Sequence, residues 1–357
     1  MQLSILLPTH RHDLLACSRI AQACSWAGPN VEVIVRDNSG DPQKRQLLPH
    51  FQRDHCNIII AEPCDGPTNF SEVLRLAKGK FVFPLADDDF CFDHAVALLP
   101  GVIGQFDMDS SVAGITGAYA VETSKGSSVV SYPDLESDDV VARVAGYLSS
   151  SGPNTLAYSP VRREIVQRVF AFMNSLPFYF SFHDQVLCLI YLLSGKFVRL
   201  QRLLYLYDMG PWEATESAQK RDVDFYALAG LDPAINKLHW FLCGFEGAVL
   251  IRNSDVFPNH SLAQRQVIAD RWFSTMFVRF QGHVRLTFDS RFADEAEKLC
   301  AKLRTSSGQL SFHNMLAEVS GFIALFSKTD AQRYFDFWGA VLNKRALPAR
   351  PASFGCS

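Results

Sequence analysis

Short apolar runs alternate with helix-like stretches at the start of the chain, and this alternation constrains the fold more than any other feature. The runs cover residues 3–7, 31–35, 57–61 and 81–85. The runs at residues 3–7 and 31–35 are typical of strands that are buried on both faces of a sheet. Strands that helices separate at intervals of roughly 25–30 residues predict βαβ units. The expected fold class is therefore α/β, with a mostly parallel central sheet flanked by helices.

Capping residues predict where several helices begin. Asn69 is the expected N-cap of a helix that runs to residue 77, and Asp93 is the expected N-cap of a helix that runs to residue 106. Thr329-Asp330-Ala331-Gln332 has the form of a capping box and predicts the start of the last helix. Further helices are expected over residues 13–26, 42–51, 162–173, 186–193, 261–280, 291–304 and 311–326, and further strands over residues 115–121, 128–132, 156–158 and 197–207.

The chain is long enough for two domains with a sizeable core. It has 357 residues, of which 48% are hydrophobic and 28 are Phe, so it is expected to be globular. The composition shifts near residue 211, where helix signals begin to dominate. We therefore expect a first domain over residues 1–210, a mainly helical domain over residues 211–346 and a loose tail over residues 347–357.

Charge and cysteine content argue against several classes of protein. The net charge is −3 with both signs interspersed, so no basic surface predicts nucleic acid as a partner. The nine Cys include no CxxC pair, which favours reduced thiols in the cytoplasm. The chain starts without the cationic region of a signal peptide, and no run reaches the ~18 apolar residues of a membrane span. The expected location is the cytoplasm, with peripheral contact at the inner face of the membrane left open.

Three consecutive carboxylates follow the fourth apolar run. Asp87, Asp88 and Asp89 stand there, and like charges this close repel each other unless a cation joins them. Mg²⁺ and Mn²⁺ prefer carboxylate oxygens, so a divalent cation is one interpretation; a solvated acidic turn before a helix is the other. Thr9 and Asp37 follow two other strands. Because ligands of parallel sheets bind beyond the carboxyl ends of the strands, we expect these polar groups to converge on one crevice.

Five segments of residues 1–210, in matching order and with similar spacing, resemble the GT-A nucleotide-sugar glycosyltransferases, specifically the large inverting family called family 2. They are Leu3-Ser4-Ile5-Leu6-Leu7-Pro8-Thr9, Val33-Ile34-Val35-Arg36-Asp37-Asn38-Ser39, Gly66-Pro67-Thr68-Asn69 with Ala77-Lys78-Gly79-Lys80-Phe81, Asp87-Asp88-Asp89, and His183-Asp184 before an apolar helix and Gly195. The chain departs from the family at three positions, and one of them is Asp65, in a region where relatives often carry a basic or amide residue. Ala86 stands where relatives often carry Asp, so the triplet aligns in either of two registers, and His183 stands where an acidic residue is common.

The resemblance implies a Rossmann-like GT-A fold, with the C-terminal helical part outside it, and it implies roles for site residues. Asp37 would read the nucleotide base, and Asp184 would accept the proton of the acceptor hydroxyl as general base. Asp87 and Asp89 would hold Mn²⁺ or Mg²⁺, and which two of the three Asp bind the metal is left open. The residues expected at the nucleotide sugar are Pro8, Thr9, Asp37, Asn38, Asp65, Asn69, Asp87 and Asp88.

The implied activity is metal-assisted, inverting transfer of a hexosyl or related group from a nucleoside-diphosphate sugar, with a UDP-sugar as the first candidate. The acceptor would be a glycan, a lipid-linked molecule or a protein, as in polysaccharide biosynthesis. The C-terminal helices are free to bind acceptor, join two copies of the chain or dock to a membrane. Two alternatives stay open: a catalytically silent module that binds a sugar nucleotide or glycan, and a sugar-phosphate nucleotidyltransferase. The latter calls for a Gly-rich loop after the first strand, where this chain has Thr9-His10-Arg11-His12.

Overall fold

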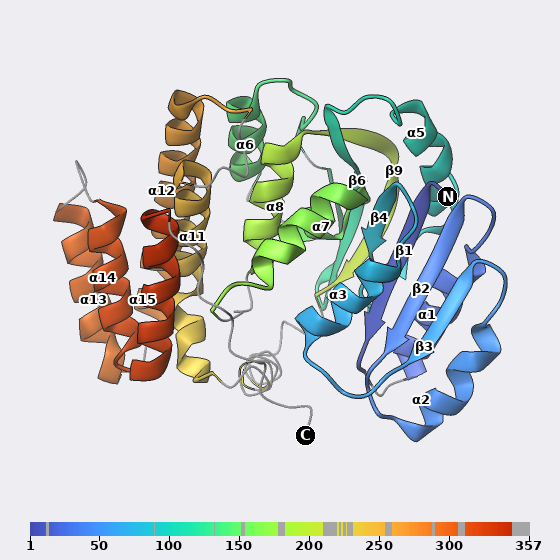
Figure 1. Ribbon diagram of the computed structural model, residues 1–357, viewed down its shortest axis with the longest axis horizontal. Coiled ribbons are helices and arrows are strands. Elements are labelled where there is room, and N and C mark those ends of the chain that lie inside the picture. The colour runs from blue at the N-terminus through green and yellow to red at the C-terminus, as the bar shows by residue number, and fades with distance from the viewer. Residues whose placement is uncertain are drawn as a thin grey trace. The chain divides into compact units, whose positions relative to one another are not determined.

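A computed structural model gives the structure of the chain (Figure 1). It describes residues 1–11, 14–88, 90–131, 133–150, 154–177, 183–209, 220, 223, 226, 231–253, 259–287, 290–305 and 311–344. The described residues divide into two compact units. The first unit holds residues 1–172 and 190–209, and the second holds residues 173–189 with those described from residue 220 onward. The expected domain boundary at residues 210 and 211 and the expected tail at residues 347–357 lie outside the described residues.

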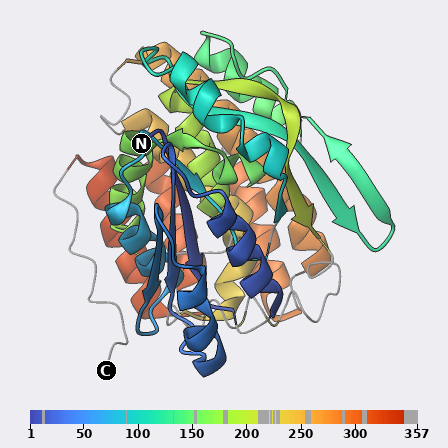
Figure 2. The same ribbon diagram turned by 90° about the vertical axis from the view of Figure 1, so that its right-hand side faces the viewer.

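A curled nine-stranded sheet organises the first unit. Its strands are β1 (Leu3–Thr9), β2 (Val31–Asp37), β3 (Cys56–Ile60), β4 (Phe81–Pro84), β5 (Phe90–Cys91), β6 (Val112–Thr123), β7 (Gly126–Val130), β8 (Val161–Arg162) and β9 (Lys196–Asp208). Their order in the sheet is β3-β2-β1-β4-β8-β6-β9-β5. The remaining strand, β7, forms a hairpin with the C-terminal half of β6 (Figure 2).

The first four strands confirm the expected βαβ arrangement. β1 pairs in parallel with β2 and with β4, and β2 pairs in parallel with β3. Residues 3–7, 31–35 and 81–84 are buried throughout, as nearly continuous apolar runs predict. The register places Thr9 opposite Asp37 at the ends of β1 and β2. The carboxyl edge of this part of the sheet therefore carries two of the polar residues that the sequence singled out.

Helices connect these strands. In the first unit they are α1 (Leu14–Ser25), α2 (Pro42–Leu47), α3 (Gly66–Leu76), α4 (Asp93–Val96), α5 (Leu99–Gln105), α6 (Val140–Ser149) and α7 (Arg163–Met173), whose last residue belongs to the second unit, together with the 3₁₀ segments η1 (Leu48–Phe51) and η2 (Asn154–Tyr158). Leu99, Ile103, Val144 and Val166 are among the side chains by which these helices enter the core.

The start of α3 differs from the expectation. The helix begins at Gly66, so Asn69 lies inside it and the prediction that Asn69 is the N-cap is wrong. Asp65 is the N-cap, because its side chain accepts a hydrogen bond from the backbone N–H of Thr68 at 2.7 Å. Pro67 in the first turn also favours a helix start here. Two capping residues stand four positions apart, and the earlier one caps the helix.

Three other local expectations are wrong as well. Asp93 is the first residue of α4, and Phe92 occupies the N-cap position. The expected long helix is split into α4 and α5, because Pro100 has no N–H with which to continue the ladder of hydrogen bonds. Residues 156–158 lie in the 3₁₀ segment η2, and the nearby strand is β8, which pairs with β4 and β6.

The described residues of the second unit are mostly helical. Its helices are α8 (His183–Ser194), of which residues 183–189 belong to this unit, then η3 (Pro233–Leu238), α11 (His239–Asn253), α12 (Leu262–Thr287), α13 (Ser290–Thr305), α14 (Phe312–Ile323) and α15 (Lys328–Leu342). Ser261 and Ser311 accept hydrogen bonds at the starts of α12 and α14. Among the described residues, no helix is both long enough and apolar enough to cross a membrane.

The N-cap of α15 is Ser327, so the capping box predicted at Thr329–Gln332 is wrong. The Ser327 hydroxyl accepts a hydrogen bond from the backbone N–H of Asp330 at 3.2 Å. Ser327 and Asp330 are themselves spaced as Ser-x-x-Asp, which is the same signal two residues earlier.

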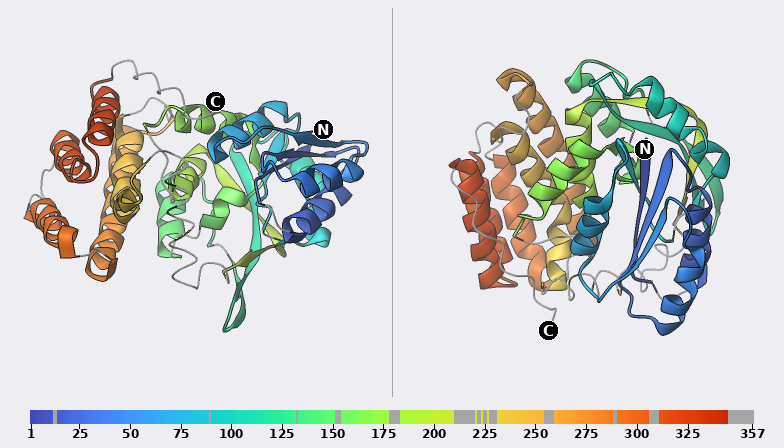
Figure 3. Two further views of the ribbon diagram at one scale, coloured as in Figure 1. Left: turned by 90° about the horizontal axis from the view of Figure 1, so that it is seen from below. Right: turned by 45° about the vertical axis from the view of Figure 1, so that its right-hand side comes forward.

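Two glycines of α11 let its neighbours approach closely. α11 and α12 lie side by side along their lengths (Figures 1 and 3). A Cβ atom added to Gly244 would lie 2.9 Å from Met276 Cβ, and one added to Gly247 would lie 2.9 Å from Leu189 Cδ2. The Trp272 indole lies over the same segment and donates to the Cys243 carbonyl at 2.9 Å. α11 is therefore packed against α12 and against the part of α8 in this unit.

Candidate active site

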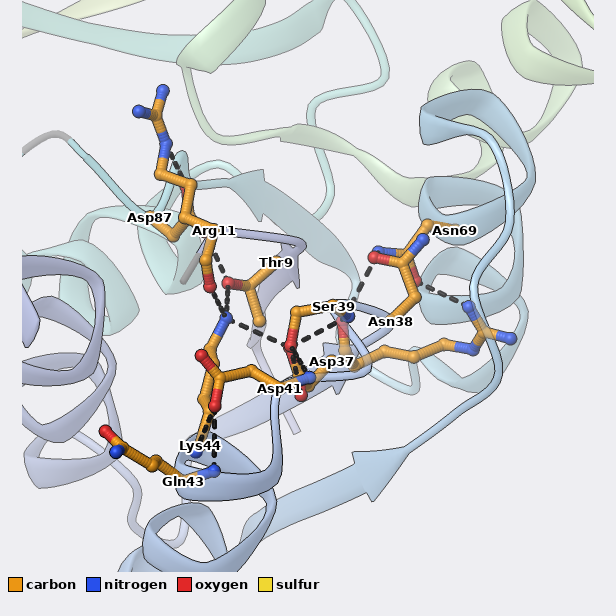
Figure 4. A network of polar contacts seen from close by, with 11 residues as sticks. Thr9, Arg11, Asp37, Asn38, Ser39, Asp41, Gln43, Lys44, Asn69 and Asp87 are labelled. Atoms are coloured by element: carbon orange, nitrogen blue, oxygen red, sulfur yellow. Dashed lines mark hydrogen bonds and ion pairs between the residues drawn. The ribbon is translucent and has the colours of Figure 1, made fainter. Parts of the chain in front are cut away.

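Lys44 joins the carboxyl ends of β1 and β2. Asp41 caps α2 by accepting hydrogen bonds from two backbone N–H groups of its first turn, one of them that of Lys44. The Lys44 side chain turns back to the sheet edge, where the residue is 3% exposed (Figure 4). Its ammonium lies 2.9 Å from Asp37 Oδ1, and it donates to Thr9 Oγ1 at 2.6 Å and to the Arg11 carbonyl at 2.8 Å. Three acceptors thus match the three N–H donors of the ammonium group.

Arg11 connects the Asp triplet to the same edge. Its Nε lies 3.0 Å from Asp87 Oδ1, and its Nη2 forms an ion pair with Asp88 Oδ2. The Thr9 hydroxyl donates to the other oxygen of Asp87. We call Thr9, Arg11, Asp37, Lys44, Asp87 and Asp88 the carboxyl-edge network. Of its charged groups, three are carboxylates and two are cations, so its own side chains balance all but one of its negative charges.

Asp37 is the innermost member of the carboxyl-edge network. It is 0% exposed. Besides Lys44, its carboxylate accepts from the Ser39 hydroxyl at 3.0 Å and from the Ser39 backbone N–H at 3.3 Å. In this conformation Asp37 holds Lys44 and the turn after β2 in place. Its contact with a nucleotide base stays a prediction, which requires this turn to open.

Asn38 and Asn69 form a second polar group next to the turn after β2 (Figure 4). Asn69 Nδ2 donates to Asn38 Oδ1 at 3.0 Å, and Arg36 Nη1 donates to Asn69 Oδ1 at 2.6 Å. Asn38 Nδ2 donates to the Cys64 carbonyl at 2.7 Å. Both amides are buried. Asn69 therefore links α3 to the end of β2, a role different from the cap that its sequence position suggested.

Pro8 and Asp65 flank these groups. Pro8 lies opposite Arg36 in the β1–β2 register, one residue before Thr9. Asp65 caps α3 and follows Cys64, the residue that binds Asn38. In the part of the chain that the structure describes, neither is recorded in a side-chain hydrogen bond or ion pair with the carboxyl-edge network. Their contacts with a nucleotide sugar stay predictions.

Asp184 belongs to the second unit, in the first turn of α8. Its Oδ1 accepts from the backbone N–H of Gln185 at 2.8 Å. The Cys243 thiol of α11 is near enough to be affected by its charge: burial raises the pKa of Cys243 well above its usual value, and the charges of Glu246 and Asp184 raise it further. The expected general base therefore lies at the start of a helix that packs against α11.

Solved structures match almost the whole chain. S. aureus TarS 1–349 has a TM-score of 0.55 at 13% sequence identity, with 97% of this chain and 92% of TarS covered. The complex of TarS 1–349 with UDP-GlcNAc has a TM-score of 0.54 at 14% identity, with 97% of this chain and 93% of TarS covered. The chain has a glycosyltransferase fold.

The other comparisons give weaker matches or none. The mannosyltransferase PcManGT from Pyrobaculum calidifontis, in complex with GDP-Man and Mn2+, has a TM-score of 0.42 at 11% identity, covering 92% of this chain and 86% of PcManGT. That likeness is too weak to support an argument. No protein-family model matches the chain. No curated protein matches it either. The fold assignment therefore rests on the likeness to TarS.

The chemistry of Asp87 and Asp88 fits a divalent cation. Mg²⁺ and Mn²⁺ sites commonly use one or two carboxylates and complete their shell with water and substrate phosphates. Asp87 and Asp88 are two such carboxylates, whereas Asp89 lies outside the described residues. The described part of the chain contains no group of three or more His, Cys, Asp or Glu side chains that could hold a metal ion. A cation at Asp87 and Asp88 would compete with Arg11 for these oxygens.

Sequence reasoning missed Lys44, Arg11 and Glu246. Lys44 and Arg11 occur in charged, polar stretches that look like surface. Glu246 is a lone acidic residue in the apolar helix α11, and it is 2% exposed. That isolation was a usable signal, because Glu is almost never fully buried unless it has a partner.

Proposed function

We propose that the chain is an inverting, family 2-like glycosyltransferase that moves a sugar from a nucleoside-diphosphate sugar to an acceptor hydroxyl. The observation that carries the proposal is the carboxyl-edge network, which gathers Thr9, Asp37 and Asp87 at the strand ends where α/β sheets bind ligands. The likeness to the TarS complex with UDP-GlcNAc supports a UDP-sugar as the donor.

In this proposal the donor lies along the carboxyl edge of β1, β2 and β4. The nucleoside contacts Thr9, Asp37 and Asn38, with Pro8, Asp65 and Asn69 shaping that end of the site. The diphosphate lies at Asp87 and Asp88. The hydrogen bonds from Lys44 to Thr9 and from Thr9 to Asp87 support this arrangement, because they connect the two ends of the donor site through one set of buried contacts.

Asp87 and Asp89 would hold Mn²⁺ or Mg²⁺, with Asp88 as the alternative ligand. Such a cation neutralises the charge that develops on the leaving diphosphate. Arg11 holds Asp87 and Asp88 together while no cation is bound, which keeps their mutual repulsion low.

Asp184 is the proposed general base. The acceptor oxygen loses its proton to the Asp184 carboxylate as that oxygen bonds to the anomeric carbon, and the bond to the diphosphate breaks in the same step. One displacement inverts the anomeric centre. A carboxylate suits this role because it is ionised near neutral pH when its pKa is in the ordinary range.

The remaining assignments extend the proposal. Residues 1–210 would bind the donor, and residues 211–346 would serve the acceptor, join two copies of the chain or contact a membrane surface. The acceptor class is a glycan, a lipid-linked molecule or a protein, as in polysaccharide biosynthesis. The cytoplasm, with or without contact at the inner face of the membrane, is the proposed location, because the cysteines suit a reducing compartment.

A thermal-shift screen followed by a turnover assay tests the proposal. Nucleoside diphosphates and sugar nucleotides are added with and without Mn²⁺, and the best ligand should raise Tm, since binding to the folded state stabilises it. Release of nucleoside diphosphate from the best donor is then measured. Asp184→Asn should keep that Tm shift but lower turnover by about 10²–10⁴-fold. Asp270→Asn, an exposed carboxylate on α12, is the matched control and should keep turnover.

Two outcomes contradict the proposal. If sugar nucleotides bind but no donor releases its nucleoside diphosphate, the chain is a catalytically silent binding module. If no nucleotide or sugar nucleotide shifts Tm with or without Mn²⁺, the assignment of the carboxyl edge as a donor site fails.

A further inference from the structure

A buried carboxylate on α11 contacts the residue that precedes the proposed base. Glu246 is 2% exposed and His183 is 4% exposed. His183 Nε2 lies 3.2 Å from Glu246 Oε2. This contact joins the middle of α11 to the first residue of α8, and Asp184 is the next residue of α8.

Holding a charge at this place costs free energy. Burial raises the pKa of Glu246, and the hydrogen bond with His183 offsets part of that rise. Tyr334 of α15 faces the same carboxylate, and burial followed by the charge of Glu246 raises its pKa well above the usual value. An apolar or amide side chain of similar size would avoid this cost, so the carboxylate is not explained by stability.

The other charged groups around Glu246 do not replace His183 as its partner. The Cys243 thiol, one turn earlier on α11, has a raised pKa because of burial and the charges of Glu246 and Asp184. Arg279 of α12 acts in the opposite direction on Cys243. His183 lies at hydrogen-bond distance from Glu246, and Tyr334 interacts with the same carboxylate.

The contact lies at the first turn of α8. The first backbone N–H groups of a helix have no backbone partner within it, and here the Asp184 carboxylate accepts from the N–H of Gln185. A tertiary contact at His183 adds to what holds this turn. α11 approaches α8 closely, because a Cβ atom at Gly247 would meet Leu189 Cδ2 at 2.9 Å. Glu246 is the residue next to this close approach, and His183 is the residue next to Asp184.

We infer that Glu246 is a positioning residue for Asp184. It binds His183, and it thereby fixes the first turn of α8 and the direction of the Asp184 carboxylate. This inference rests on the proposed function, because Asp184 matters here as the base.

Glu246→Gln tests the inference, because the amide keeps the size of the side chain and removes its charge. We expect kcat to fall by about 10–100-fold, since a small misplacement of a reacting group costs about that much. The KM for the donor should stay within about 2-fold, because the donor residues of the first unit are untouched. Tm should rise, since a costly buried charge is removed.

Two further variants separate positioning from general damage. Ser311→Ala removes the N-cap of α14, so it should lower Tm and leave kcat unchanged. His183→Gln should lower kcat about as much as Glu246→Gln, and the double variant should be no slower than His183→Gln alone. That non-additivity is the sign that Glu246 acts through His183.

The outcomes are distinct from those of the proposed function. An unchanged kcat for Glu246→Gln, or additive losses in the double variant, overturns the inference while the glycosyltransferase proposal stands. If the wild-type chain turns over no donor, the proposed function fails, and hydrogen exchange at residues 185–188 decides the structural part. If these amides exchange faster in Glu246→Gln than in wild type, and Ser311→Ala exchanges like wild type, then Glu246 holds the first turn of α8. Equal exchange in wild type and Glu246→Gln would overturn this part of the inference.

Discussion

Buried carboxylates occur in two different settings in this molecule. At the carboxyl edge, Asp37 faces the Lys44 ammonium and Asp87 faces the Arg11 guanidinium. In the helical unit, Glu246 faces an imidazole, which carries a charge only when it is protonated. The same functional group is therefore compensated in one region and incompletely compensated in the other.

This difference determines what a neutralising substitution does. Where a buried carboxylate is paired with a cation, loss of either partner leaves an uncompensated charge and is strongly destabilising. At Glu246, whose pKa is raised by burial, loss of the carboxylate should remove a cost. At the carboxyl edge, the ion pairs stabilise the folded state. In the helical unit, the Glu246 carboxylate lowers stability, and its contact with His183 holds that side chain in place.

Lys44→Met should break the compensated region most severely. The substitution leaves Asp37 buried without its cation and removes a donor to Thr9, so the free energy of unfolding should fall by about 3–5 kcal/mol. Urea unfolding of the full chain measures the change. The double variant with Asp37→Asn should recover part of the loss, because it removes the stranded charge. A loss below about 1 kcal/mol would contradict the importance that we give to this pair.

Thr9→Val should have the next largest effect. Val keeps the shape of Thr but leaves Asp87 without one donor and Lys44 without one acceptor, which should cost about 1–3 kcal/mol. Thr275→Val is a matched control, because that hydroxyl bonds to the Arg271 carbonyl within its own helix, and it should change stability by less than about 0.5 kcal/mol. Equal effects of the two variants would argue against the network.

Glu246→Gln should change the free energy of unfolding in the opposite direction from Lys44→Met and Thr9→Val. The variant should be more stable than wild type. The raised pKa of Glu246 means that the folded state holds its proton more tightly than the unfolded state does. Below the usual glutamate pKa of 4.5, both states are protonated and wild type and variant should be similar in stability. As pH rises through the folded-state pKa, wild type should lose stability relative to Gln, by on the order of 1 kcal/mol. Urea unfolding at several pH values measures this; a wild type that gains stability relative to Gln would contradict it.

Lys302→Met should have the smallest effect. It is the same substitution as at Lys44, but Lys302 lies on the surface, 2.8 Å from Glu318, with its side chain 63% exposed. Because water screens such pairs, the change in unfolding free energy should be below about 0.5 kcal/mol. If Lys302→Met lowered the free energy of unfolding nearly as much as Lys44→Met, burial would not explain the large effect at Lys44.

The first four parallel strands were predictable from sequence because their signal is local. Strands buried on both faces leave uninterrupted apolar runs, so residues 3–7, 31–35 and 81–85 could be recognised directly. Helix starts were harder, since Asp65 and Asn69 are both good caps within four residues and the sequence does not say which one is used. The same competition occurs between Ser327 and Thr329.

The acidic residues of the candidate site were predictable from sequence, whereas its cationic residues Lys44 and Arg11 were not. The acids of the triplet stand out because adjacent Asp residues need a reason to be together. Lys44 lies in a six-residue helix, which is too short to reveal a periodic face, and it is surrounded by other polar residues. Its burial follows from the position of α2 against the sheet edge, which depends on tertiary contacts that no local pattern encodes.

The Arg11 clamp on Asp87 and Asp88 has a practical consequence for crystallography. A tethered guanidinium competes with a dissolved cation at an effective concentration in the millimolar range or above. Soaking crystals in a manganese salt by itself should therefore leave these carboxylates on the arginine. If these carboxylates hold the cation of the proposed function, metal and nucleotide would have to be supplied together, because the diphosphate would provide further ligands to the ion.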